Sequence, residues 1–175
     1  DGTLAAADVT VCGNTGIGVV NVRGALTMTN ALVCGNTLDG IFMASNSSAT
    51  LTNVTVASNG RRGIGGNEEV TLVNSIVALN AADGISAEIA NAVVSHTIIG
   101  IDPGFVDPAA GDWRLRPTSI AVNRGDTAGA VGADGAPLAT DLDGLPRVAD
   151  GTVDVGAFEY QGAPDPTRET PATVV

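Results

Sequence analysis

Four aspartates lie close together near the C-terminal end of the chain, in the stretch DLDGLPRVADGTVD. They are Asp141, Asp143, Asp150 and Asp154. Alternating carboxylates and free carbonyl groups around a glycine turn are ligands that a hard cation such as calcium prefers, although the spacing falls short of an EF-hand loop. The alternative is that these side chains form Asx turns and pair with Arg147. The stretch therefore predicts either a calcium site or structural turns, and no other cofactor is expected.

A second group of charged residues could cleave a polysaccharide. Asp39 and Asp83 each precede a glycine, and Arg61 and Arg62 lie between them in the chain. If the two aspartates stand two coils of a solenoid apart, about 10 Å separates them, which is near the upper limit for an inverting glycosidase. No Trp or Tyr lies near them in the sequence to hold a sugar. We therefore expect no enzyme activity, and a polysaccharide-binding or polysaccharide-cleaving lyase or hydrolase is the alternative.

The two cysteines and the single histidine offer little for a metal site. Cys12 and Cys34 are 22 residues apart and occupy the same position in two successive repeats. Their backbones should lie about 5 Å apart, so a disulfide bond and two stacked thiols are both compatible with the sequence. His96 stands where earlier repeats have Asp8 or Asn30. We interpret it as a turn residue rather than a zinc ligand.

A repeat of about 22 residues must position all of these side chains. Its anchors Asn14, Asn36, Asn59 and Asn80 are separated by 22, 23 and 21 residues, and Asp102 follows 22 residues later. An apolar branched residue stands three positions before each anchor: Val11, Val33, Val56, Val77 and Ile99. A glycine stands four positions after each of the first four: Gly18, Gly40, Gly63 and Gly84. The fixed spacing indicates a solenoid.

The composition of the repeat decides which solenoid it is. Short alternating segments rich in Val, Ile and Thr are interrupted by Gly and Asn, which is typical of strands joined by tight turns. Neither the helical segment nor the repeated leucines of a leucine-rich repeat are present. We therefore predict an all-β fold, a right-handed parallel β-helix of about five coils of 21–23 residues, with equivalent strands stacked about 4.8 Å apart.

Stacking in register predicts two ladders of asparagine side chains, each bonded to the amide of the next coil. One comprises Asn14, Asn36, Asn59 and Asn80, and the other comprises Asn30, Asn53 and Asn74. We expect the recurring glycines at turns that require a positive φ.

Charge and hydropathy limit the partners. Hydrophobic residues make up 44% of the chain but aromatic residues only 3%, which suits a narrow core of small side chains. The net charge of −11 argues against nucleic acid and anionic lipid surfaces, which need a positive patch. No apolar run is long enough to span a membrane.

After Asp102 the period fails and a resemblance to a known family becomes visible. The succession FVDPAAGDWRLRPTSIAVNRGD followed by ATDLDGLPRVADGTVDVGAFEY is similar to the C-terminal region of bacterial surface proteins of the choice-of-anchor Q type, where it follows a right-handed parallel β-helix. The resemblance implies a secreted cell-surface β-helix with a linker towards an anchoring device and no catalytic residues. The family pattern has an acidic residue where this chain has Asn123, and one more proline.

The chain accordingly divides into coils at residues 1–102, a C-terminal capping segment at 103–160 and a Pro/Thr-rich tail or linker at 161–175. The end of a β-helix exposes strand edges and an apolar cross-section, so natural solenoids cover it. We expect a lid made of the large apolar residues of the segment, which are Phe105, Trp113, Leu115, Phe158 and Tyr160.

These features predict a non-enzymatic extracellular structural protein at the cell surface, an adhesive or spacer module. No cap precedes TLAAADVTV at the N-terminal coil, and an open strand edge recruits another chain. We therefore expect either head-to-tail association into a fibre, aided by strand addition from the β-prone tail ETPATVV, or a place in a larger surface chain. Extracellular polysaccharide is the other partner considered.

Overall fold

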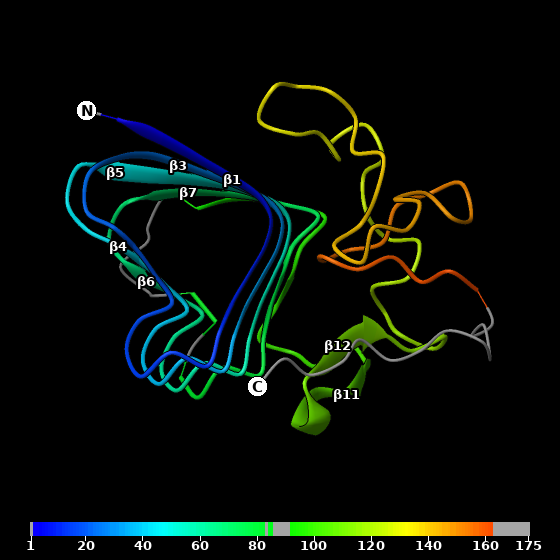
Figure 1. The fold of residues 1–175 in the computed structure, drawn as a ribbon, viewed down its shortest axis with the longest axis horizontal. Coiled ribbons are helices and arrows are strands. Elements are labelled where there is room, and N and C mark those ends of the chain that lie inside the picture. The colour runs from blue at the N-terminus through cyan, green and yellow to red at the C-terminus, as the bar shows by residue number, and fades with distance from the viewer. Residues whose placement is uncertain (1, 83, 86–91, 163–175) are drawn as a thin grey trace.

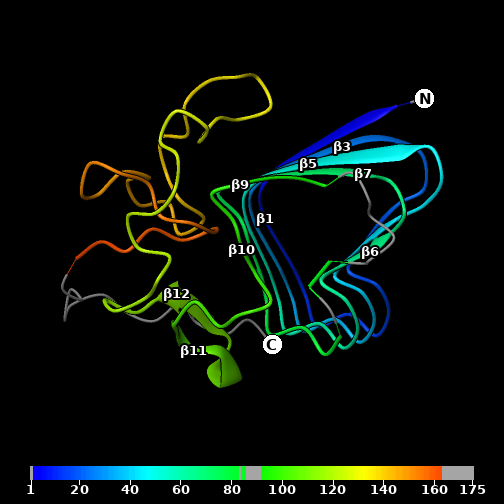
Figure 2. The same cartoon turned by 180° about the vertical axis from the view of Figure 1, so that it is seen from behind.

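The computed structural model describes residues 2–82, 84–85 and 92–162. It is an all-β solenoid of parallel strands with about four turns, which confirms the predicted class. Figures 1 and 2 look roughly along the stack of coils from opposite sides. Among the described residues, the sole helical element is the short 3-10 helix η1 (Pro108–Ala110).

The larger sheet is built from strands that recur once per coil. It contains β1 (Thr3–Cys12), β3 (Gly24–Cys34), β5 (Ser47–Ala57), β7 (Glu69–Val73), β8 (Ile76–Ala78), β9 (Val93–Ser95) and β10 (Ile98–Ile99). A smaller sheet on another side of the coil contains β2 (Val19–Asn21), β4 (Ile41–Met43) and β6 (Ile64–Gly66). All of these neighbours pair in parallel.

The register follows the period of the sequence. Val33 is paired with Val11 on one side and with Val56 on the other, and Val77 continues the same column. These valines face the interior, where Leu51, Ile64 and Leu72 are also fully buried. Stacked columns of aliphatic side chains therefore fill the narrow core with few aromatic rings.

A left-handed residue bends the chain at one fixed position of every coil. Asp8, Asn30, Asn53, Asn74 and His96 have φ values of 54°, 47°, 52°, 50° and 45°. Asn, Asp and His are the non-glycine residues that tolerate this conformation best. The prediction that His96 is a turn residue is confirmed.

The prediction for the recurring glycines was wrong. Gly18, Gly40 and Gly63 are absent from the residues with positive φ. They are required because a Cβ atom at Gly40 would lie 2.7 Å from Asn59 Nδ2 and 2.8 Å from the carbonyl oxygen of Gly63. Gly18 and Gly63 face the same obstruction from Asn36 and Asn80. The glycine makes room for the asparagine of the following coil.

The fifth repeat is incomplete, which is why the number of turns is nearer four than five. Its strands β9 and β10 are short, and they pair with β7 and β8. Asp102 does not extend the asparagine column, because its Oδ1 accepts the backbone N–H of Gly104 at 2.9 Å. The chain leaves the solenoid at this point.

The C-terminal segment lies along the flank of the solenoid and not over its end. It begins with an antiparallel pair, β11 (Phe105–Asp107) and β12 (Asp112–Leu115), and continues as turns. Both views show it beside the coils, coloured from yellow-green to orange. Its side chains pack on residues that face outward from three successive coils. These residues are Leu32, Cys34, Ala57, Ile76 and Ala78. The expected position as an end cap is therefore corrected to a lateral brace.

The aromatic residues expected to form the lid build this lateral contact instead. Phe105, Trp113, Leu115 and Phe158 are buried in it, and Tyr160 packs against it while partly buried. Phe105 and Trp113 meet edge to face, with ring centroids 5.2 Å apart. Residues 163–175 of the tail, including ETPATVV, lie outside the described residues. No helix in the described part of the chain is long and apolar enough to cross a membrane.

Candidate functional site

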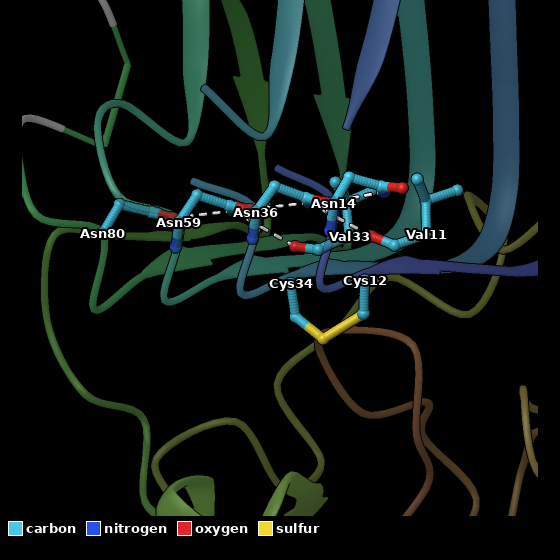
Figure 3. The surroundings of a disulfide bond; sticks show 8 residues. All are labelled: Val11, Cys12, Asn14, Val33, Cys34, Asn36, Asn59 and Asn80. Atoms are coloured by element: carbon cyan, nitrogen blue, oxygen red, sulfur yellow. Dashed lines mark hydrogen bonds between the residues drawn. A yellow bond between two sulfur atoms is a disulfide. The ribbon is translucent and has the colours of Figure 1, made fainter. Parts of the chain in front are cut away.

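The first asparagine column is a continuous hydrogen-bonded ladder (Figure 3). Asn14 Nδ2 donates to Asn36 Oδ1 at 2.8 Å, Asn36 Nδ2 to Asn59 Oδ1 at 2.9 Å, and Asn59 Nδ2 to Asn80 Oδ1 at 3.0 Å. The same oxygens accept the backbone N–H of the preceding rung. The second proton of each inner amide goes to a strand carbonyl, for example from Asn36 to Val11 at 3.1 Å.

The second column binds the C-terminal segment more than it binds itself. Asn30 Nδ2 donates to Asp8 Oδ1 at 3.2 Å, and Asn74 Nδ2 lies 3.5 Å from Asn53 Oδ1. No bond joins Asn53 to Asn30 in the described structure. The expected second ladder is therefore interrupted.

The remaining bonds of this column hold the C-terminal segment at three successive coils. Asn30 Nδ2 donates to the carbonyl of Thr140 at 2.7 Å. Asn53 Nδ2 reaches the carbonyls of Asp154 at 3.2 Å and Gly156 at 3.3 Å. Asn74 donates to the carbonyl of Asp126 at 2.8 Å and accepts the N–H of the same residue at 2.7 Å. The left-handed bend thus presents one asparagine per coil to the C-terminal segment.

At the centre of this contact is a buried arginine. Arg147 is fully buried, and its Nη2 donates to Glu159 Oε2 at 3.1 Å. Its Nη1 donates to the carbonyl of Ala157 at 3.1 Å and to Asn30 Oδ1 at 3.3 Å. Its Nε has no hydrogen-bond partner among the described residues. The guanidinium therefore joins the two parts of the C-terminal segment to the solenoid.

Two of the four predicted calcium ligands are held by backbone N–H groups in the same network. Asp141 Oδ1 accepts from Asp143 at 3.0 Å and Leu145 at 2.9 Å, and its Oδ2 accepts from Glu159 at 2.9 Å. This is the Asx turn that was the alternative to calcium.

Asp154 repeats this arrangement. Its two oxygens accept the N–H groups of Asn123 at 2.7 Å and Tyr160 at 2.5 Å. Both aspartates are buried. Each of their oxygens is therefore already an acceptor for the backbone.

The other two aspartates lie further out. Asp143 is half-buried, in electrostatic reach of Arg114, and Asp150 is exposed. Within the described ranges, no group of three or more His, Cys, Asp or Glu side chains is placed to hold a metal ion. The structure does not bring the four aspartates together as one ligand set.

The carboxylates of Asp141, Asp154 and Glu159 are buried around the single guanidinium of Arg147, and their pKa values are raised. Burial raises the pKa of Glu159 to about 7, and the neighbouring charge of Asp154 acts in the same direction. Burial also raises the pKa values of Asp141 and Asp154, against the lowering effect of their backbone hydrogen bonds and of Arg147. The network therefore favours a proton on at least one carboxyl group near neutral pH.

The residues considered for polysaccharide cleavage are engaged with one another. Asp39 is 1% exposed. Its Oδ1 accepts from the backbone N–H and the Nε of Arg62, both at 3.1 Å, and its Oδ2 lies 3.6 Å from Nη1 of Arg61. Asp83 lies outside the described residues. A buried carboxylate that ties one coil to the next is poorly placed to reach a sugar.

Cys12 and Cys34 form a disulfide bond between the first two coils (Figure 3), with Cα atoms 4.6 Å apart. The sequence alone was compatible with either this bond or two free thiols. The bridge forms part of the wall of a groove of about 710 Å³ beside the C-terminal segment. Other residues of its wall are Leu32, Trp113, Arg114 and Phe158. The two aromatic side chains are buried in the brace, so they offer no open stacking face.

Sequence reasoning missed Glu159, the acid that pairs with Arg147. The signal was present, because DLDGLPR and DVGAFEY are the two stretches in which the family resemblance is most specific. Asp141, Arg147, Asp154 and Glu159 all come from these stretches and all are buried. Their spacing is explained by the contacts that join them within the fold.

No family model matches this chain, and neither a curated protein nor a solved structure matches it. The parallel β-solenoid fold is therefore established by the structure itself, and the similarity to choice-of-anchor Q proteins depends on the motifs alone.

Proposed function

We propose that the chain is a non-enzymatic structural module of the extracellular cell surface, a β-solenoid spacer or adhesin whose copies associate head to tail into a fibre. The observation that carries the structural role is the engagement of Asp39 with Arg61 and Arg62. These residues were the strongest candidates for sugar chemistry, and they support a structural tie between coils. Glu159, Asp141 and Asp154 are likewise engaged within the fold.

The disulfide supports an extracellular location. Disulfide bonds persist in oxidising compartments and are rare in the cytosol. The Cys12–Cys34 bridge adds a covalent link between two coils that strand pairing and the Asn14–Asn36 bond also join. The resemblance of DLDGLPR and DVGAFEY to bacterial choice-of-anchor Q proteins supports the same location.

The last coil supports self-association. Apolar residues at the C-terminal end of the solenoid are exposed to solvent, among them Leu79, Val93, Val94, Ile99 and Ile101. In the described part of the chain, the C-terminal segment packs on the flank and does not cover this end. Exposed apolar surface next to unpaired strand edges is a surface for association.

The test combines sedimentation with an activity assay. We expect species larger than a monomer to accumulate as the protein concentration rises from micromolar to millimolar. We also expect no reducing-sugar release from a panel of uronates and glucans. A monomer at millimolar concentration contradicts the fibre. Turnover that Asp39→Asn abolishes, while the melting temperature is kept, contradicts the non-enzymatic role.

A further inference from the structure

The C-terminal end of the solenoid carries the pattern of an interior coil without its next neighbour. Val94 stacks on Leu72 and Ile99 stacks on Val77. Leu72 and Val77 are fully buried, whereas Val94 is 45% exposed and Ile99 is 37% exposed. Both side chains therefore occupy core columns that one further coil would cover.

The first coil of the same chain has the matching pattern. Ala6 belongs to the column of Leu72 and Val94, and Val11 belongs to the column of Val77 and Ile99. Strand β1 pairs with β3 along one edge. Its other edge has the polarity needed to continue a parallel sheet from β9 and β10, because all of these strands run in the same direction.

The left-handed column supplies complementary polar groups at the two ends. It begins with the carboxylate of Asp8 and finishes with the imidazole of His96, and asparagine fills the three positions between them. His96 Nδ1 is bonded to Ser95 Oγ at 2.9 Å, which leaves Nε2 for a further partner. Asp8 and His96 are both exposed.

We propose that β9 and β10 of one copy receive β1 of a second copy as the next coil, with Ala6 on Val94, Val11 on Ile99 and Asp8 beside His96. The proposal rests on the head-to-tail association above and specifies its joint. A slip of one residue along the strand turns every side chain to the opposite face. It would separate Asp8 from His96, so contact between this acid and this imidazole favours the proposed register.

The front and back surfaces of this joint differ. The two surfaces of the joint, β9 and β10 on one copy and β1 on the next, lie at opposite ends of the described coils, so the contact does not close and generates a filament. A symmetrical contact between two C-terminal ends would instead bring β9 and β10 of both copies together and stop at a dimer.

Charge exchange tests the polar contact. His96→Asp should raise the concentration at which half of the protein sediments as polymer by about tenfold, because it opposes two carboxylates. The double variant Asp8→His/His96→Asp should restore the wild-type value. Thermal melting of each dilute variant serves as the folding control, and both Asp and His tolerate the left-handed position.

Cross-linking tests the register. Ala7 and Ser95 belong to one column, and the Cys12–Cys34 bridge, with its Cα atoms 4.6 Å apart, shows that in-register neighbours can be bridged. A mixture of Ala7→Cys and Ser95→Cys proteins should form a covalent heterodimer on mild oxidation. Ser95→Cys alone should remain uncross-linked.

The outcomes separate the joint from the proposed function. Polymer that forms equally well with His96→Asp, or cross-links that form with Ser95→Cys alone, overturns this joint while the fibre stands. A wild-type protein that remains monomeric at millimolar concentration overturns the fibre and the joint together. Loss of polymer in His96→Asp, with recovery in the double variant, supports both.

Discussion

Arg147 Nη2 lies 3.1 Å from Glu159 Oε2, and the two side chains are 0% and 1% exposed. The pair joins two motifs that are separated in the chain, and the same guanidinium reaches Asn30 on the second coil. A buried charge that loses its partner is strongly destabilising. We therefore expect this pair to be a main support of the C-terminal segment on the solenoid.

The stability of the protein should fall as the pH rises from about 4.5 to about 7. The folded-state pKa of Glu159 is about 7 and its ordinary value is 4.5, so the folded state binds more protons than the unfolded state in this window. The loss should be at most about 3 kcal/mol, by the usual conversion of a pKa shift. Urea denaturation at a series of pH values measures it, and Glu159→Gln should flatten the slope. An equal slope in this variant would assign the effect to Asp141 and Asp154.

Arg147→Leu should release the C-terminal segment from the coils. The substitution leaves Glu159 buried without its cation, at a loss of about 3 to 5 kcal/mol. Trp113 is the only tryptophan and is buried in the brace, so its fluorescence should shift to the red. Arg116→Leu is the matched control, because Arg116 is exposed and its side chain bonds only the carbonyl of Val106 in the described structure. Unchanged fluorescence in Arg147→Leu would show that the aromatic contact alone holds the segment.

Asn36→Ala should destabilise the solenoid by about 1 to 3 kcal/mol, because buried amide and carbonyl groups lose their partners. Asn36 bonds both Asn14 and Asn59 and the carbonyl of Val11. Thr37→Ala is the control, since its exposed hydroxyl contacts only the carbonyl of Asn14. Chemical denaturation of both variants measures the difference. If both variants lose the same free energy of unfolding, backbone hydrogen bonds rather than the Asn36 side chain stabilise this turn.

Gly40→Ala should also destabilise the protein, by about 1 to 3 kcal/mol, the usual range for overpacking. The added Cβ atom would lie 2.7 Å from Asn59 Nδ2 and from Val56 Cγ1. Gly16→Ala provides the control, because nothing lies within 4 Å of a Cβ atom there and its φ is not positive. Melting temperatures of the two variants test the reason for the glycine. If Gly40→Ala and Gly16→Ala melt at similar temperatures, the asparagine ladder can shift to admit a methyl group.

Calcium should leave the melting temperature unchanged at millimolar concentration, and a chelator should have no effect. The oxygens of Asp141 and Asp154 already accept backbone N–H groups, and Arg147 supplies positive charge in the same network. Calorimetry with and without calcium makes the measurement. A rise in the melting temperature that Asp143→Asn abolishes would restore the cation site.

The period of the sequence predicted the solenoid and its columns, because parallel stacking repeats one environment in every coil. The pairing of Val33 with Val11 and Val56 follows directly from the spacing of the anchors. The bend at His96 also followed, since the residues of that column share a tolerance for positive φ.

The lateral packing could not be read from the period, because it involves residues outside the repeat. One signal was present in the strands. Leu32, Ala57 and Ile76 alternate with the inward valines and are apolar on the outward side, whereas a solvated flank should be polar there. The role of the glycines was also hidden, since close approach and positive φ favour the same residue.

The brace changes how the coils unfold. Repeat proteins are often described by nearest-neighbour coupling, with each unit free to peel from the end. Here one segment is bonded to Asn30, Asn53 and Asn74 on three successive coils. To detach, each of these coils must therefore also break its bond to a segment that the neighbouring coils hold in place. Under a pulling force along the stack, they should therefore yield together in one cooperative step, while the disulfide keeps the first coil attached to the second.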